Sequence, residues 1–285
     1  MTKRTKNYYI TQKFTPDVKE SQPLKGSMEN FLRVQNLSKF FGGLAAIHDV
    51  EFHVTQGEIL SIIGPNGAGK TTLFNLLTGI YRPSRGEIFW QGEPIMHYSP
   101  HQIARRGIAR TFQTTALFGE LSVLDNVIIG HRCRLRSDLR DALLRTKRLR
   151  TEEKKSLDSA QEILSFVGLW DARKNSARNI SQEGQKRLSI AMALATQPQL
   201  LLLDEPTGGL ITEETGELMN LFLGIIKRGV TLCLIEHKMR VVMNVSNRVM
   251  VLNHGEKIAE GPPQEISRHP AVIEAYLGEE YAAPS

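Results

Sequence analysis

The sequence predicts an α/β fold in which a parallel sheet is interrupted by an inserted helical segment. Residues 58–63, 200–203 and 230–235 are short apolar runs, as expected of strands buried on both faces of a parallel sheet. Between the first two runs, residues 122–170 are rich in Leu, Arg, Lys and Glu, with helical spacing and no strand pattern. The sequence therefore indicates an α/β core with a helical insertion.

The elements before the insertion are short and are separated by turn residues. Gly42 and Gly43 mark the turn region between the first two strands. We expect strands at residues 31–34, 46–54, 58–63, 87–90 and 111–113, and a helix at residues 71–77.

The second half of the core begins with a helix. Asn179 or Ser181 is placed to cap this helix, which runs through Ala191 and Leu194. The elements expected next are a strand at residues 200–203, a helix at 216–227, a strand at 230–235, a hairpin over 248–260 and a short terminal helix from 262.

The composition is that of a globular protein and excludes several other classes. Hydrophobic residues make up 41% and charged residues 23% of the 285 residues, which excludes collagen-like, low-complexity and wholly disordered chains. The apolar runs are far shorter than the roughly 18–20 residues of a membrane-spanning helix, and no secretory signal is expected. Cys133 and Cys233 lie far apart, which favours a reducing compartment.

The net charge is +6, and two basic segments outweigh a remainder of the chain that is mildly acidic. Residues 131–155 hold ten Lys/Arg against four Asp/Glu, and residues 1–27 hold six against two. Such a segment can face nucleic acid, anionic lipid or an acidic partner, or can be a solvated helix face. Residues 1–28 are polar without periodicity and are expected to form a disordered basic tail.

A phosphate-binding loop is predicted where the first apolar run ends. Residues 64–71 fit the pattern G-x-x-x-x-G-K-[ST] between a predicted strand and a predicted helix. The glycines let successive N–H groups point into one anion-binding hollow, and the helix N-terminus adds positive partial charge. Lys70 can reach the β- and γ-phosphates, and the Thr71 hydroxyl suits Mg²⁺. The candidate nucleotide-binding residues are Gly64, Pro65, Asn66, Gly67, Ala68, Gly69, Lys70, Thr71 and Thr72.

Two carboxylates follow the apolar run at residues 200–203. Asp204 and Glu205 end a buried strand, so we expect them at the C-terminal edge of the sheet, where open α/β sheets bind ligands. Asp204 is predicted to hold Mg²⁺ through water, and Glu205 is predicted to polarise the attacking water.

Together these motifs resemble the nucleotide-binding subunit of ATP-binding-cassette (ABC) transporters. The resemblance is carried by residues 64–72, 110–113, 180–191, 200–205 and 235–237. Within that superfamily the chain is most similar to the ATPases of branched-chain amino acid importers, on residues 41–44, 63–72, 110–113, 236–239 and 275–279.

The resemblance implies a fold and its division. The fold is a P-loop NTPase, an ABC nucleotide-binding domain of the α/β class with an N-terminal antiparallel β subdomain. The ATPase domain would span residues 29–279, with a helical subdomain at about residues 114–190 inserted in a RecA-like core. Residues 280–285 would form a C-terminal tail.

The resemblance also implies roles for single residues at matching positions. Phe41 would stack on adenine, although Phe40 competes for this role. Gln113 would reach Mg²⁺ or the attacking water. His237 would hold the γ-phosphate and orient Glu205, and the other seven histidines are interpreted as surface residues.

The segment that would contact the partner subunit's ATP departs from the family pattern. Leu-Ser-Gly-Gly-Gln is usual there, whereas this chain has Ile-Ser-Gln-Glu-Gly, which keeps Ser181 and supplies a glycine only at Gly184. Gln182 and Glu183 replace glycines whose amides can approach the γ-phosphate closely, and Glu183 adds a negative charge. We hypothesise a heterodimer with a second ABC ATPase; the alternative is that the substitutions are neutral.

The function implied by the resemblance is ATP hydrolysis, with ATP and Mg²⁺, that powers an importer for branched-chain amino acids or a similar small solute. The expected partners are two transmembrane permease subunits, a second ABC ATPase or a second copy, and indirectly a periplasmic or extracellular solute-binding protein, but no nucleic acid. The expected location is peripheral, at the cytoplasmic face of the inner membrane. The alternatives are an ABC ATPase for urea, amides, aromatic acids or lipid export, or a soluble non-transport ABC ATPase, which the basic residues 131–155 favour.

Overall fold

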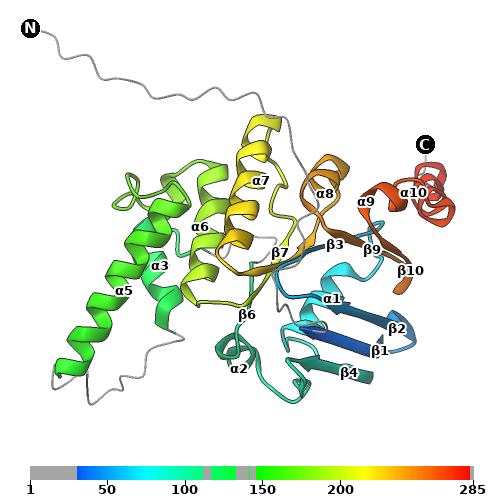
Figure 1. The fold of residues 1–285 in the computed structure, drawn as a ribbon, viewed down its shortest axis with the longest axis horizontal. Coiled ribbons are helices and arrows are strands. Elements are labelled where there is room, and N and C mark those ends of the chain that lie inside the picture. Colours follow the sequence, from blue (N-terminus) through cyan, green and yellow to red (C-terminus); the bar gives the residue numbers. More distant parts are fainter. Residues whose placement is uncertain (1–30, 112–116, 133–140, 142–145, 283–285) are drawn as a thin grey trace, which may run out of the picture.

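The structure, a computed structural model, describes residues 31–111, 117–132, 141 and 146–282 (Figure 1). Its centre is a six-stranded sheet. In spatial order the strands are β10 (Glu256–Gly261), β9 (Arg248–Asn253), β3 (Ile59–Ile63), β8 (Thr231–Ile235), β7 (Leu200–Asp204) and β6 (Ile108–Arg110). Neighbouring strands are parallel except β9 and β10, which form an antiparallel hairpin. The C-terminal ends of the parallel strands therefore share one edge.

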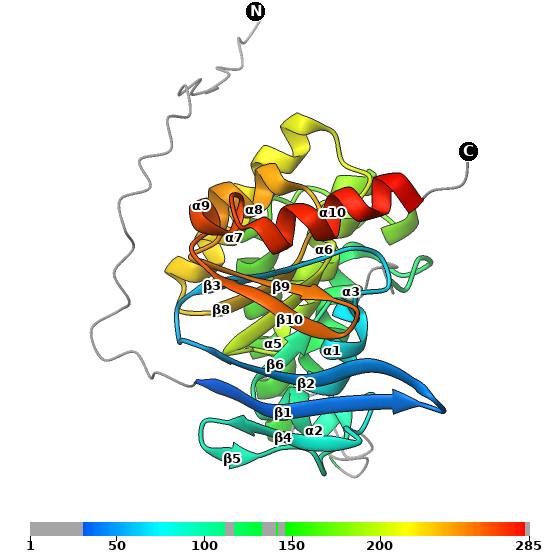
Figure 2. The same cartoon turned by 90° about the vertical axis from the view of Figure 1, so that its right-hand side faces the viewer.

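A second sheet is antiparallel and lies beneath the first in Figure 2. It has four strands in the order β2 (Leu44–Val54), β1 (Leu32–Phe41), β4 (Arg85–Trp90) and β5 (Glu93–Pro94). Helix α1 (Lys70–Leu77) lies between the two sheets. The antiparallel β subdomain expected near the N-terminus is thereby confirmed.

The inserted helices gather on one side of the six-stranded sheet (Figure 1). They are α3 (Val123–His131), α5 (Lys147–Phe166) and α6 (Gln182–Ala195), with the 3₁₀ turn η2 (Ala177–Asn179) before α6. The other helices are α2 (Pro100–Arg105), α7 (Thr212–Lys227), α8 (Met239–Val245), α9 (Pro263–Ile266) and α10 (Pro270–Ala282). Within the described part of the chain, no helix combines the length and apolar character needed to cross a membrane.

The core lies on both faces of the six-stranded sheet because side chains alternate along each strand. On β7, Leu200 and Leu202 face α1 and the antiparallel sheet, whereas Leu201 and Leu203 pack with the inserted helices. All four side chains are fully buried. A strand that is apolar on both faces explains why residues 200–203 form a continuous aliphatic run.

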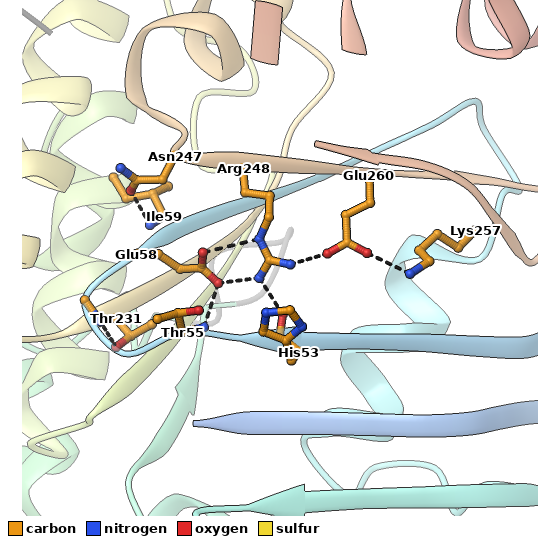
Figure 3. Close-up of polar contacts among 10 residues, drawn as sticks. His53, Thr55, Glu58, Ile59, Thr231, Asn247, Arg248, Lys257 and Glu260 are labelled. Atoms are coloured by element: carbon orange, nitrogen blue, oxygen red, sulfur yellow. Dashed lines mark hydrogen bonds and ion pairs between the residues drawn. The ribbon is translucent and has the colours of Figure 1, made fainter. Parts of the chain in front are cut away.

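A polar network joins the start of the core sheet to its neighbours (Figure 3). Arg248, the first residue of β9, donates to Glu58 at 2.6 Å and to the backbone oxygen of His53 at 2.7 Å, and it also pairs with Glu260 of β10. Burial alone would lower the pKa of Arg248, but hydrogen bonds and charge from Glu58 and Glu260 outweigh it and raise that pKa. The network fixes β2, β3, β9 and β10 relative to one another.

Several predicted boundaries differ from the structure. The strand is β6, and Thr111, where a strand was expected to begin, already follows its end. Residues 112 and 113 of that prediction lie outside the described part. Ser181 caps α6 by accepting from the N–H of Gly184 at 3.1 Å, whereas Asn179 ends η2. Helix α10 continues to Ala282, past the boundary expected at residue 279. The tail expected at residues 1–28 lies outside the described residues.

Candidate nucleotide-binding site

The phosphate-loop motif forms the turn between β3 and α1, at the edge where the parallel strands end. Gly64 has a φ of +148°, and a β-carbon there would overlap the backbone oxygen of Leu252. Gly69 has a φ of +99°, and its β-carbon would lie 2.5 Å from the backbone oxygen of Ala46. Only glycine fits both the conformation and the space at these two positions. The glycines of the motif are therefore required by the packing of the loop against β2 and β9.

Lys70 is the first residue of α1, and its side chain turns back over the loop. Its Nζ donates to the backbone oxygens of Gly64 at 2.6 Å and Pro65 at 2.7 Å. The side chain is thus held above the loop, where a cation can meet a phosphate. The loop, the lysine and the N-terminus of α1 together form an anion-binding site.

The loop opens into a cleft of about 740 Å³. The cleft is lined by the phosphate loop together with Phe41, Leu44, Ala45, Ala46, Glu205 and His254. Phe41 is 43% exposed and contacts Tyr81 edge-on, with 5.2 Å between ring centroids. Phe40 does not line the cleft; its ring lies near His48 instead. An exposed ring at the rim of a phosphate site can stack on a nucleobase.

The sequence analysis missed His254 as a member of this site. It lies in the turn between β9 and β10 with a φ of +47°, and its exposed side chain lines the cleft. The next residue, Gly255, donates to the backbone oxygen of Ala68 in the phosphate loop at 3.1 Å. The sequence contains the His-Gly turn, but nothing in the turn itself shows which loop it packs against.

Asp204 ends β7 and is almost completely buried. Its Oδ2 pairs with Nη2 of Arg110 at 2.7 Å. Its Oδ1 is buried and has no hydrogen-bond partner among the residues that the structure describes. A buried carboxylate oxygen without a donor fits a position that faces a water of a bound Mg²⁺, because this cation prefers oxygen ligands and keeps several waters.

The cleft itself offers further oxygen groups to a cation. Thr71 lines the cleft beside Glu205. Among the described residues, no group of three or more His, Cys, Asp or Glu could hold a metal ion by itself. Mg²⁺ carried by nucleotide phosphates needs only one or two protein oxygens, and the Thr71 hydroxyl and the Asp204 carboxylate are of the type that it prefers.

Glu205 and His237 follow two neighbouring parallel strands, β7 and β8, and meet at the same edge. Nδ1 of His237 lies 4.0 Å from Oε2 of Glu205. Glu205 has a φ of +46°, and its side chain faces the cleft. The His237 side chain is 54% exposed. The fold therefore places an imidazole 4.0 Å from a carboxylate that lines the cleft of the phosphate loop.

Several predicted site residues are not among those that line the cleft, and these include Gly64, Pro65, Asp204 and His237. Ser181 and Gly184 stand at the N-terminus of α6, and neither lines the cleft. Gln113 lies outside the described residues. Glu183 turns along its own helix, where its Oε1 accepts from Nε of Arg187 at 2.6 Å. Its charge is thus paired within the helix, which the sequence analysis did not anticipate.

Comparisons with known proteins agree on one family. The model described as "ABC transporter" matches residues 47–208, and the one described as "Branched-chain amino acid ATP-binding cassette transporter" matches residues 256–282. The chain is 42% identical over 260 residues to the high-affinity branched-chain amino acid transport ATP-binding protein LivG of Escherichia coli, covering 91% of this chain and 99% of that one. It is 40% identical over 249 residues to BraF of Pseudomonas aeruginosa, a protein of the same description, covering 87% and 98%.

A solved structure shares the same fold. The crystal structure of the ADP conformation of MJ1267, an ATP-binding cassette of an ABC transporter, matches with a TM-score of 0.78 and 32% identity. The match covers 88% of this chain and 99% of that chain.

Proposed function

The chain belongs to the ABC transporter family of ATP-binding cassettes, and on this premise we propose that it is the ATP-hydrolysing subunit of an importer for branched-chain amino acids. The cargo assignment is supported by the C-terminal match at residues 256–282 and by the relatives LivG and BraF, which are described as branched-chain amino acid transport proteins. The alternative cargo is a similar small solute, because the ATPase subunit itself makes no contact with the cargo.

The nucleotide is held at the cleft between the phosphate loop and Phe41. The triphosphate lies against the loop amides and Lys70, and the adenine stacks on the exposed ring of Phe41. Thr71, Gln113 and, through water, Asp204 would hold Mg²⁺, which neutralises phosphate charge when bound. The partnerless Oδ1 of Asp204 is the observation that best supports this arrangement.

Hydrolysis is assigned to the pair that follows β7 and β8. Glu205 accepts a hydrogen bond from the attacking water and aligns it with the γ-phosphate. His237 lies 4.0 Å from Glu205, orients its carboxylate and contacts the γ-phosphate. The 4.0 Å relationship between Glu205 and His237 is the single observation that carries the assignment.

Two such subunits sandwich ATP, so that the phosphate loop of one faces the start of α6 in the other. In this chain Gln182 and Glu183 stand where glycine amides would approach the partner's ATP. The Glu183–Arg187 pair reduces the repulsion from Glu183, but it does not restore a glycine amide. We therefore place a second, different ABC ATPase opposite this chain. The ATP bound by this chain would then meet a segment of the partner that keeps the usual glycines.

The remaining partners follow from the transport role. Two transmembrane permease subunits would bind the chain at the cytoplasmic face of the membrane, and a solute-binding protein would deliver cargo on the other side. ATP favours the closed ATPase dimer because it contacts both subunits, and hydrolysis removes that bridge.

The proposal is tested by isolating the complex. The chain is tagged in its own cell, membranes are solubilised gently, and co-purifying chains are identified. Two hydrophobic permease-like chains and a second ATPase are expected. Recovery of ribosomes, DNA or no membrane chain would reject the importer and favour a soluble ABC ATPase, and recovery of this chain as the sole ATPase would reject the heterodimer.

A further inference from the structure

Two loops of the site lie side by side because they leave adjacent parallel strands. Residues 205–211 connect β7 to α7, and residues 236–238 connect β8 to α8. The backbone N–H of Glu205 donates to the oxygen of Ile235 at 2.9 Å, so the pairing of β7 with β8 extends into the first loop. The first loop begins with Glu205, and the second contains His237.

Lys238 spans the gap between these loops. Its Nζ donates to the backbone oxygens of Thr207 and Leu210, each at 2.9 Å. These carbonyls lie near the two ends of the same bend, because the N–H of Leu210 donates to the oxygen of Thr207 at 3.2 Å. One ammonium group therefore holds the loop at two points before α7 begins.

Glu236 holds the same loop from the other side of His237. Its carboxylate is fully buried, and its Oε1 accepts from Oγ1 of Thr207 at 2.7 Å and from the N–H of Thr207 at 3.0 Å. Its Oε2 accepts from the N–H groups of His237 at 3.3 Å and Lys238 at 3.5 Å. A buried carboxylate with four donors is well satisfied and hard to displace.

Each polar group of Thr207 is thus hydrogen-bonded to Glu236 or Lys238, the residues on either side of His237. Its N–H and hydroxyl bind Glu236, and its carbonyl binds Lys238. A shift of the backbone at His237 must therefore move Thr207, which is two residues from Glu205. A third contact supports the same loop, since Nζ of Lys186 on α6 donates to the backbone oxygen of Glu205 at 3.4 Å.

We propose that Lys238 is a positioning residue for ATP hydrolysis, which with Glu236 keeps Glu205 and His237 in fixed register across the two loops. This inference rests on the proposed roles of Glu205 and His237. The ammonium group of Lys238 is bound to the carbonyls of Thr207 and Leu210, so it acts through the loop and not on ATP. Its loss therefore slows the hydrolytic step more than it weakens ATP binding, because the phosphate loop and Phe41 are untouched.

The test uses the full-length chain in its purified transporter complex. Steady-state ATP hydrolysis is measured for the wild-type complex and for Glu205→Gln. The activity that is lost in Glu205→Gln is the share of total hydrolysis that depends on this subunit. Lys238→Met keeps the side-chain stem but removes the donors. We expect it to lower the kcat of that share by about tenfold, with KM changed by less than about twofold. Lys238→Arg, which keeps donors for two carbonyls, is expected to recover part of the loss.

Three comparisons separate positioning from general damage. Lys227→Met, at an exposed position at the end of α7, is the matched control and is expected to keep wild-type kcat. In a His237→Ala background, Lys238→Met is expected to add little, since the two act on the same step. Glu236→Gln is a second variant that keeps the side-chain shape, and it is expected to lower kcat in the same direction.

The outcomes are distinguishable. An unchanged kcat in both Lys238→Met and Glu236→Gln, or a loss confined to KM, overturns the positioning role. The positioning role would also be overturned if the fold-loss in kcat of the double variant equalled the product of the losses in Lys238→Met and His237→Ala alone. If Glu205→Gln and His237→Ala both leave hydrolysis unchanged, the proposed site itself is wrong, whatever Lys238 does.

Discussion

Arg110 and Asp204 form a buried ion pair, with 2.7 Å between Nη2 and Oδ2 and side-chain exposures of 5% and 1%. Arg110 also donates to Oδ1 of Asn75 at 2.6 Å, so it ties β6 and β7 to the helix that follows the phosphate loop. The pair occupies one oxygen of Asp204 and leaves the other without a hydrogen-bond partner in the described part of the chain. One carboxylate can thus have two roles, one structural and one directed at the cation of the nucleotide.

Replacement of Arg110 by methionine is expected to destabilise the protein by about 3–5 kcal/mol, because it leaves a buried carboxylate without its cation. The measurement is the free energy of unfolding in urea without nucleotide. Adding Asp204→Asn should return much of that stability, since a neutral amide is less costly to bury unpaired. A loss of unfolding free energy below about 1 kcal/mol would mean that this buried pair stabilises the protein no more than an exposed ion pair does.

Gly69→Ala is expected to weaken both folding and ATP binding. Its β-carbon would meet the backbone oxygen of Ala46 at 2.5 Å, in a conformation with a φ of +99°. A loss of about 1–3 kcal/mol in unfolding free energy is expected. Gly67→Ala is the matched control, because Gly67 also has a positive φ but its β-carbon would have no neighbour within 4 Å. Equal losses in the two variants would contradict the steric explanation.

Arg187 is expected to compensate the negative charge of Glu183 at the start of α6. Its guanidinium binds Glu183, Glu217 and the backbone oxygen of Val167. Arg187→Met would free Glu183 to face the partner's ATP, so ATP hydrolysis in the complex is expected to fall by about two- to tenfold. Glu183→Gln in the same chain should recover it. If Glu183→Gln recovers nothing, the loss comes from the other Arg187 contacts.

Stability is expected to fall on the acid side because of His131. This histidine of α3 is 4% exposed, and burial lowers its pKa below the ordinary value of 6.5. Below pH 6.5 the unfolded chain therefore binds more protons than the folded chain, and the unfolding free energy decreases by up to about 1.4 kcal/mol per pH unit. Above pH 6.5 the contribution of the neutral His131 to stability is fully present.

The variant His131→Gln removes this titration and should flatten the pH profile of unfolding between pH 6.5 and the folded-state pKa. His269→Gln, at an exposed position before α10, is the control and should keep the wild-type slope. Identical slopes for wild type and His131→Gln would contradict the assignment.

Local motifs identify the residues that the structure brings to this edge of the sheet, because each motif depends on neighbours in the sequence. The phosphate loop needs its glycines and lysine within eight residues, and Asp204 and Glu205 directly follow the strand that carries them. Their meeting with His237 follows from parallel strands that share one edge. The order of those strands is what places β7 beside β8.

Contacts between distant segments could not be predicted in the same way. The pairing of Arg110 with Asp204 joins residues 94 positions apart, and nothing local to either residue indicates it. His131 was interpreted as a surface residue, yet α3 packs it into the inserted helices. The Glu183–Arg187 pair was accessible in principle, since a spacing of four residues places both on one helix face.

The most direct test of the account is solute uptake driven by this subunit's ATP site. Membrane vesicles that carry the transporter are loaded with ATP, supplied outside with the solute-binding protein, and given labelled leucine. We predict uptake with the wild-type chain and a fall to background with Glu205→Gln, at equal amounts of assembled complex. Absence of uptake with the wild-type chain, or uptake that Glu205→Gln leaves unchanged, would contradict the proposed function.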